Sequence, residues 1–222
     1  MTDVHCHLPG GDPAVREFLI GRDFAGIHPW EGMKDEDRGL REPVLARLRE
    51  ELAANASLGV GEIGLDRLKV REIPQTMRDV FVAQLKLAAE FHRPVVLHGA
   101  KCWGQVVKTI QALFPPPSSL IPSFLFHGFS RSDGLIPDIV KLNGFISVGP
   151  AVLNDHAVNY RKLVLKIPAD RLLLETDRTA ESAAECPSLV DIARKTAELR
   201  GVSLVELESR TDANAERFIA AK

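Results

Sequence analysis

The sequence predicts an α/β protein built as a TIM-type (β/α) barrel, on three observations. Short apolar segments with β-branched residues alternate along the chain with segments of helical periodicity. This alternation is typical of parallel strands joined by helical crossovers. Seven or eight strands can be placed, a number that favours a closed barrel, with an open doubly wound sheet as the alternative.

The individual elements follow from periodicity, caps and turn residues. Pro43 suits the first turn of a helix, Gly201 suits a helix C-cap, and Ser203 with Glu206 has the form of a capping box. We expect strands at 1–7, 15–20, 24–28, 58–64, 94–98, 124–127, 145–148 and 172–177. We expect helices at 43–55, 75–91 and 104–114, after Pro187 to near Gly201, and from Ser203 onward, with a loop at 115–119.

Composition and charge limit the classes of function. The 222 residues, 45% hydrophobic and 26% charged, fit one large globular domain over 1–222, since no repeat or linker divides them. The net charge of −2 gives no overall attraction to nucleic acid, so a polyanionic substrate would need local cations. No segment has the length and apolarity of a membrane span or the pattern of a signal peptide. Three cysteines without Cys-x-x-Cys spacing favour a reducing compartment, and we expect a cytoplasmic protein.

Side chains able to bind metal occur at the ends of five predicted strands. Alternate side chains of a strand point to the same face, so His5 and His7 lie together and Cys6 points away. The carboxyl ends of barrel strands meet on one face, which would bring distant residues into one site. The candidate ligands are His5, His7, Glu62, His98, His127 and Asp177. Any one of them could instead be a structural histidine or a capping carboxylate, but together four imidazoles and two carboxylates can hold two divalent ions.

Six short motifs occur in order along the chain. They are Asp3-Val4-His5-Cys6-His7, Gly26-Ile27-His28-Pro29-Trp30, Gly61-Glu62-Ile63-Gly64-Leu65-Asp66, Pro94-Val95-Val96-Leu97-His98, Phe126-His127-Gly128-Phe129-Ser130 and Leu174-Glu175-Thr176-Asp177. Together they resemble the motifs of the TatD-type metal-dependent hydrolases and deoxyribonucleases, TIM-barrel relatives of the amidohydrolases. The resemblance extends from Asp3 to Asn214-Ala215-Glu216-Arg217-Phe218, nearly the whole chain.

The resemblance implies a two-metal hydrolytic site. His5, His7 and Asp177 would bind one divalent ion, His98 and His127 the other, and Glu62 would lie between them. The ions would be Zn²⁺, Mn²⁺ or Mg²⁺. Asp177 and Glu62 would be catalytic, because a metal-activated water attacks phosphorus and Asp177 could orient or deprotonate that water. Glu175, two residues earlier on the same strand face, could support the ligands or be structural.

Three departures from the family pattern bear on the substrate. About twenty residues, 8–27, separate His7 from His28, where the family usually has a full helix and strand. We therefore expect a reduced first β/α unit and a more open site beside it. Lys101 follows the strand of His98 where the family commonly has a Ser-Arg pair, and lysine is a less directional phosphate ligand than arginine. Arg178-Thr179 follows Asp177 where the family usually has a proline soon after.

Residues just after the predicted strand ends are candidates for substrate binding. Each charged one could equally be a solvated loop charge or part of an ion pair. The candidates are His28, Trp30, Asp66, Arg67, Lys101 and Arg131, with Arg178 also near the site. Trp30 and Trp103 could stack on bases or could be core or lid residues.

Three functions remain open from the sequence. The first is a 3′→5′ deoxyribonuclease acting on DNA, as single strands or ends, through a metal-activated water. The second keeps the two metals but hydrolyses a small ester, amide or phosphate ester, since the fold does not decide the substrate. The third is a barrel that binds without catalysis. Binding of several phosphates would fall steeply with salt, which separates the first function from the second.

Overall fold

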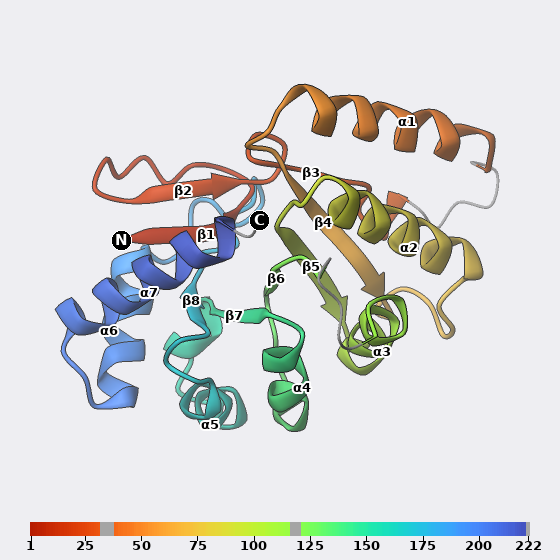
Figure 1. Cartoon of the computed structure of the whole chain (residues 1–222). Helices are drawn as coiled ribbons and strands as arrows, with labels where there is room; N and C mark the ends of the chain where they lie inside the picture. The colour runs from red at the N-terminus through yellow and green to blue at the C-terminus, as the bar shows by residue number, and fades with distance from the viewer. Residues whose placement is uncertain (32–37, 116–120, 221–222) are drawn as a thin grey trace.

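The computed structural model describes residues 1–31, 38–115 and 121–220, and its centre is a ring of parallel strands. Figure 1 shows the helices on the outside of these strands. The strands are β1 (Thr2–Cys6), β2 (Arg16–Leu19), β3 (Phe24–Ala25), β4 (Gly59–Asp66), β5 (Val95–Ala100), β6 (Phe124–Phe126), β7 (Gly144–Val148) and β8 (Leu172–Leu174). β1 pairs with β2, and β3 to β8 pair in chain order.

Single hydrogen-bonded links join the two sheets into a barrel. An isolated parallel bridge between Ile20 and Phe24 connects the end of β2 to β3. On the other side, the Asp177 N–H donates to the His5 carbonyl at 3.0 Å and the His7 N–H donates to the Arg178 carbonyl at 2.8 Å, which ties β8 to β1. The barrel prediction is therefore confirmed over the open sheet.

The helices agree with the prediction in part. They are α1 (Arg38–Ala54), α2 (Gln75–Glu90), α3 (Trp103–Leu113), α4 (Ile136–Lys141), α5 (Val158–Lys166), α6 (Leu189–Arg200) and α7 (Leu204–Ile219), with 3₁₀ turns η3 (Asp133–Leu135) and η4 (Pro150–Leu153). The predicted caps are confirmed: Gly201 has φ 65°, and the Ser203 side chain accepts from the Glu206 N–H.

One predicted helix start was wrong and two helices were missed. The first helix begins at Arg38 rather than Pro43, so Pro43 lies inside it and removes one backbone N–H donor from the helix. α4 and α5 were not predicted, because six and nine residues are too few to show a clear helical period. The predicted loop at 115–119 lies outside the described residues except at Pro115. None of the described helices is long and apolar enough to cross a membrane.

The first β/α unit is reduced, as expected. Residues 7–15 connect β1 to β2 without a helix, and a turn at 20–23 leads directly to β3. Figure 1 shows no helix over the outer side of β2. β2 is correspondingly short, and its first residue, Arg16, is exposed.

The barrel interior has an apolar lower layer that leads to the site. Phe218 of α7 is fully buried there and stacks on Phe24, with ring centroids 6.0 Å apart. Val96, Leu125 and Leu173 belong to the same buried cluster. Because side chains of a strand share a face at intervals of two, the residues two positions later are also directed toward the barrel axis, at its carboxyl end. This places His98, His127 and Glu175 above the apolar layer.

Candidate metal centre

Glu62 of β4 lies at the middle of the convergent side chains. Its carboxylate is 4% exposed. Oε1 lies 2.5 Å from His98 Nδ1 and 2.7 Å from His127 Nε2. Oε2 lies 3.7 Å from His5 Nε2 and 3.5 Å from His7 Nε2. These four histidines, which lie in β1 and β5 or directly after β1 and β6, are therefore gathered around one buried carboxylate.

Asp177 completes one side of this cluster. Its Oδ1 atom lies 3.3 Å from His5 Nε2 and 3.7 Å from His7 Nε2. The residue follows β8 with a left-handed backbone (φ 49°), a conformation that is uncommon outside glycine and that clusters at functional sites. Its side chain is 44% exposed, in contrast to Glu62. Of the two carboxylates, Asp177 is the one open to a substrate.

The donor atoms form three groups that could each hold a metal ion. They are His5, His7 and Asp177; His5, Glu62 and His127; and His28, Glu62 and His98. The first group is the one expected from the sequence. The second and third groups share Glu62. The resemblance implied that His98 and His127 would bind the same ion, whereas these groups pair His98 with His28 and His127 with His5.

The orphaned nitrogens of the cluster suit a cation. His5 is fully buried, yet neither of its ring nitrogens makes a well-directed hydrogen bond, and the same holds for His127 Nδ1. Buried polar atoms in native proteins normally have partners. A divalent ion would satisfy His5 Nε2, the nitrogen that lies near the Glu62 and Asp177 carboxylates, so the residues fit the group that the metal-dependent mechanism requires.

Burial and mutual charges set the protonation of the cluster. Burial would raise the pKa of Glu62, but the charge of His127 and hydrogen bonds from the histidines hold that pKa well below its usual range. Burial would lower the pKa of His127, but the charge of Glu62 and its hydrogen bond raise that pKa to about 10. Burial, with His127 nearby, lowers the pKa of His5. The carboxylate at the centre is therefore ionised and balanced by positive charge.

Glu175 supports the cluster from behind. It is 1% exposed, and its oxygens accept hydrogen bonds from the Gly128 N–H at 2.8 Å and the Ser147 hydroxyl at 2.6 Å. Its Oε2 lies 4.0 Å from Nδ1 of His127. Burial raises the pKa of Glu175 to about 7. It lies in none of the three candidate ligand groups, a position consistent with support rather than ligation.

Comparisons with known proteins identify the family of this chain. The profile described as TatD related DNase matches residues 22–220. The chain belongs to the TatD family. It is 32% identical over 203 residues to the 3′-5′ ssDNA/RNA exonuclease TatD of Klebsiella pneumoniae, covering 86% of this chain and 73% of that protein. It is 28% identical to the uncharacterized metal-dependent hydrolase YabD of Bacillus subtilis, and the match covers 87% of this chain and 75% of that protein.

A solved TatD-family structure shows the same fold. The crystal structure of YJJV, a TatD homologue from Escherichia coli, superposes with a TM-score of 0.76 at 23% identity, covering 98% of this chain and 97% of that one. A hydrolase TatD family protein from Entamoeba histolytica superposes with a TM-score of 0.69 at 16% identity. The superposition covers 94% of this chain and 76% of that one. The barrel with its reduced first unit is therefore a TatD-family fold.

The predicted substrate residues of this TatD-family chain divide into two sets. Arg67, Lys101 and Arg131 are exposed in the loops after β4, β5 and β6, and Lys101 and Arg131 have left-handed backbones, with φ of 56° and 59°. Trp30 is 42% exposed, and the Lys69 ammonium lies 3.7 Å from the centroid of its ring. These four residues stay candidates for substrate contact.

His28 and Asp66 lie closer to the metal centre than the sequence suggested. His28 Nε2 is 3.6 Å from Glu62 Oε1, so this residue is a candidate ligand as well as a substrate contact. Asp66 is 1% exposed, and its carboxylate binds Trp30 and His98. This geometry favours a positioning role for Asp66 over direct contact with substrate.

Trp103 does not reach the site. It is 5% exposed and packs against Phe126 and Phe129, with ring centroids 5.4 and 5.5 Å apart. Of the two alternatives that the sequence left open for this tryptophan, the structure supports the core residue. Trp103 is the first residue of α3, and its ring is buried against the strand residue Phe126. Sequence spacing alone did not reveal this orientation.

Proposed function

We propose that this protein is a divalent-metal-dependent phosphodiesterase that removes nucleotides from the 3′ end of single-stranded DNA or RNA. The observation that carries the proposal is the convergence of His5, His7, His98, His127 and Asp177 around the buried Glu62 carboxylate. The TatD exonucleases to which the chain is similar act on such strands according to their names. The exposed cations after β4, β5 and β6 supply the local positive charge that the weakly negative chain lacks overall.

In this proposal two divalent ions are held by the chain's own donors. His5, His7 and Asp177 would hold one ion, and Glu62 and His98 with His127 or His28 would hold the other. When bound, such ions polarise the phosphoryl oxygens and lower the pKa of water. The residue set of imidazoles and carboxylates suits Zn²⁺ or Mn²⁺, and Mg²⁺ less well.

Asp177 then acts on the attacking water. Burial would raise its pKa, but the His5 imidazole 3.3 Å away and the charge of His127 lower it, so the carboxylate is ionised and can accept a proton. Because its side chain is 44% exposed, it faces the space that a substrate phosphate would enter. Glu62, fully enclosed, keeps the histidines at fixed distances and does not contact substrate directly.

The test is release of nucleotides from a single-stranded oligonucleotide carrying a 5′ label, with Mg²⁺, Mn²⁺ or Zn²⁺ added. The wild type should shorten the strand stepwise from its 3′ end. Asp177→Asn should lose at least about 100-fold in rate, the scale of a removed acid–base group. Asp79→Asn, the same chemical change on the exposed face of α2, is the matched control and should keep the wild-type rate. If wild type and Asp177→Asn release nucleotides at one background rate, the proposal is wrong.

A second measurement separates the nucleic-acid substrate from a small ester. The rate on the oligonucleotide should fall steeply as salt rises, because several phosphates are bound at once. Hydrolysis that is insensitive to salt, together with faster turnover of a small phosphate ester, would instead favour a small-molecule hydrolase.

A further inference from the structure

A cleft opens beside Asp177, on the side of the barrel formed by the segments after β6, β7 and β8 and by α5. Its volume is about 940 Å³, at the upper end of the range for ligand pockets, roughly 300–1,000 Å³. Asp177 and Glu175 line it, and so do Arg131 and Lys162. The cleft is therefore continuous with the candidate metal centre and larger than a single phosphate requires.

Cations on the cleft wall can offset the exposed carboxylate of Asp177, which belongs to the candidate metal centre. Lys166 also lines the cleft, but its ammonium is paired with Asp133. The side chains of Arg131 and Lys162 have no ion-pair or hydrogen-bond partner among residues 1–31, 38–115 and 121–220. Glu175 is buried and directed toward backbone and hydroxyl donors, so its carboxylate is turned away from an incoming anion.

The first turn of α5 adds backbone donors to the same wall. Residues 157–160 line the cleft, and Ala157, the N-cap of α5, provides no side-chain cap. The first N–H groups of a helix have no intrahelical partner and attract phosphate. Val158 in this turn is 53% exposed and offers apolar surface to a sugar or base. The Tyr160 hydroxyl accepts from the Gly149 N–H at 3.0 Å and holds this turn against η4.

We infer that this cleft binds the sugar-phosphate backbone of the nucleotides adjoining the scissile phosphate, through Arg131, Lys162 and the first turn of α5. The inference rests on the proposed function, and it specifies on which side of the metal centre the strand lies. Backbone recognition of this kind does not depend on base identity. It applies equally to single-stranded DNA and RNA, whose phosphates are alike.

The test measures binding without cleavage. The full-length protein, with EDTA present, is titrated into labelled oligothymidine and, separately, oligouridine, between about 50 and 200 mM salt. Each lost phosphate contact makes the slope of log K against log salt shallower by about 0.7 for single strands. The double variant Arg131→Gln/Lys162→Gln should bind more weakly than the wild type, with a slope shallower by about 1.4.

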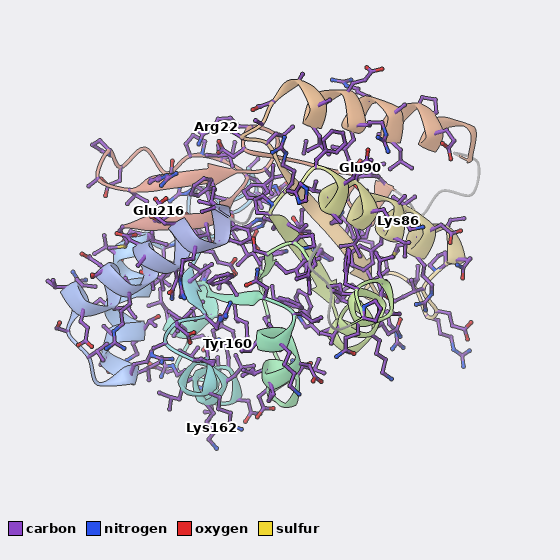
Figure 2. The ribbon with its side chains drawn as sticks, in the orientation of Figure 1. Arg22, Lys86, Glu90, Tyr160, Lys162 and Glu216 are labelled. Carbon is purple, nitrogen blue, oxygen red and sulfur yellow. The ribbon has the colours of Figure 1, made fainter. Side chains whose placement is uncertain are left out.

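Two control proteins separate the effect of the cleft cations from the effect of lower net charge and from that of changed side chains. Lys86→Gln/Lys108→Gln removes the same charge from exposed positions on α2 and α3 and should keep the wild-type slope. Figure 2 shows Lys86 on α2 well apart from Lys162 on α5. Arg131→Lys/Lys162→Arg retains both charges and should restore most of the slope, which loss of local structure would not allow.

The outcomes separate this inference from the proposed function. If the wild type releases nucleotides but the cleft variant and the Lys86/Lys108 control change the slope equally, the strand does not lie in the cleft and the inference is overturned. Absence of any salt-dependent binding by the wild type overturns it too. If the cleft variant loses slope as expected while the wild type releases no nucleotides with any metal, the cleft binds strands and only the proposed function fails.

Discussion

Asp66 connects the candidate metal centre to the surrounding loops, and its replacement by asparagine tests that connection. Its Oδ2 atom accepts a hydrogen bond from Trp30 Nε1 at 2.8 Å and lies 2.9 Å from His98 Nε2. Its Oδ1 atom accepts from the Leu68 N–H at 2.5 Å. Asp66→Asn keeps the size of the side chain but replaces one acceptor oxygen by an NH₂ group. In one orientation of the amide the NH₂ group faces the Trp30 N–H, and in the other it faces the Leu68 N–H, so two donors face each other in both cases.

The expected effect follows from the tautomer of His98. A carboxylate that accepts a hydrogen bond from Nε2–H leaves the Nδ1 lone pair directed toward Glu62 and toward an ion held there. An NH₂ group at the same place favours the proton on Nδ1, where it prevents metal binding. Loss of such a supporting partner typically lowers metal affinity about 10–100-fold, or about 1.4–2.8 kcal/mol.

Isothermal titration of the metal-free protein with Mn²⁺ and Zn²⁺ measures this change directly. Trp30→Phe is the matched control, because it removes the Trp30 donor but leaves Asp66 bound to His98. We expect Asp66→Asn to bind the second ion more weakly and Trp30→Phe to keep the wild-type affinity. Equal affinities for all three proteins would refute the positioning role of Asp66, and so would an equal loss in both variants.

Three further predictions concern stability. Removal of divalent ions by EDTA should lower the free energy of unfolding, by about 2.7 kcal/mol relative to ions at 100 times their Kd, and calorimetry should show a Tm that recovers when metal is restored. Ser203→Ala removes the acceptor of the Glu206 N–H at the start of α7 and should cost about 1 kcal/mol in urea unfolding, whereas Ser57→Ala in an exposed turn should cost almost nothing. Phe218→Ala should cost about 3–5 kcal/mol in the same assay, because this ring is fully buried against Phe24; a cost below 1 kcal/mol would contradict its place in the barrel core.

The strands could be predicted from the sequence because each is a short apolar run bounded by turn residues. All eight predicted strands are present, although β3 is reduced to Phe24–Ala25 and β8 ends at Leu174, before the motif residues Glu175 and Asp177. Asp177 itself has a left-handed backbone, which an apolar pattern does not encode. The helices between β6 and β8 escaped prediction because their few turns are stabilised by packing against the strands rather than by propensity.

The convergence of the six candidate ligands could be predicted, but their neighbours could not. The period of two along a strand relates Val96 to His98 and Leu125 to His127, so an apolar core position marks the ligand position above it. No such rule places His28 beside Glu62, because β3 ends at Ala25 and a loop carries His28 to the centre. The cleft beside α5 was missed for the same reason. Its walls come from loops and a short helix, whose relative positions depend on tertiary packing.

The short connection between His7 and His28 contains no helix that could cover β1, so other contacts must hold His5 and His7 in place. The structure places that support on the opposite side of β1. The Asp3 carboxylate accepts hydrogen bonds from the Thr176 N–H at 3.1 Å and the Thr176 hydroxyl at 2.6 Å, and the Asp177 N–H donates to the His5 carbonyl. β1 is thereby fixed to the segment that carries Asp177, and His5 stays fully buried although β2 is short. Because the first candidate ligand group comes from β1, the residue that follows it and this segment, a reduced β/α unit on the other side can leave its geometry unchanged.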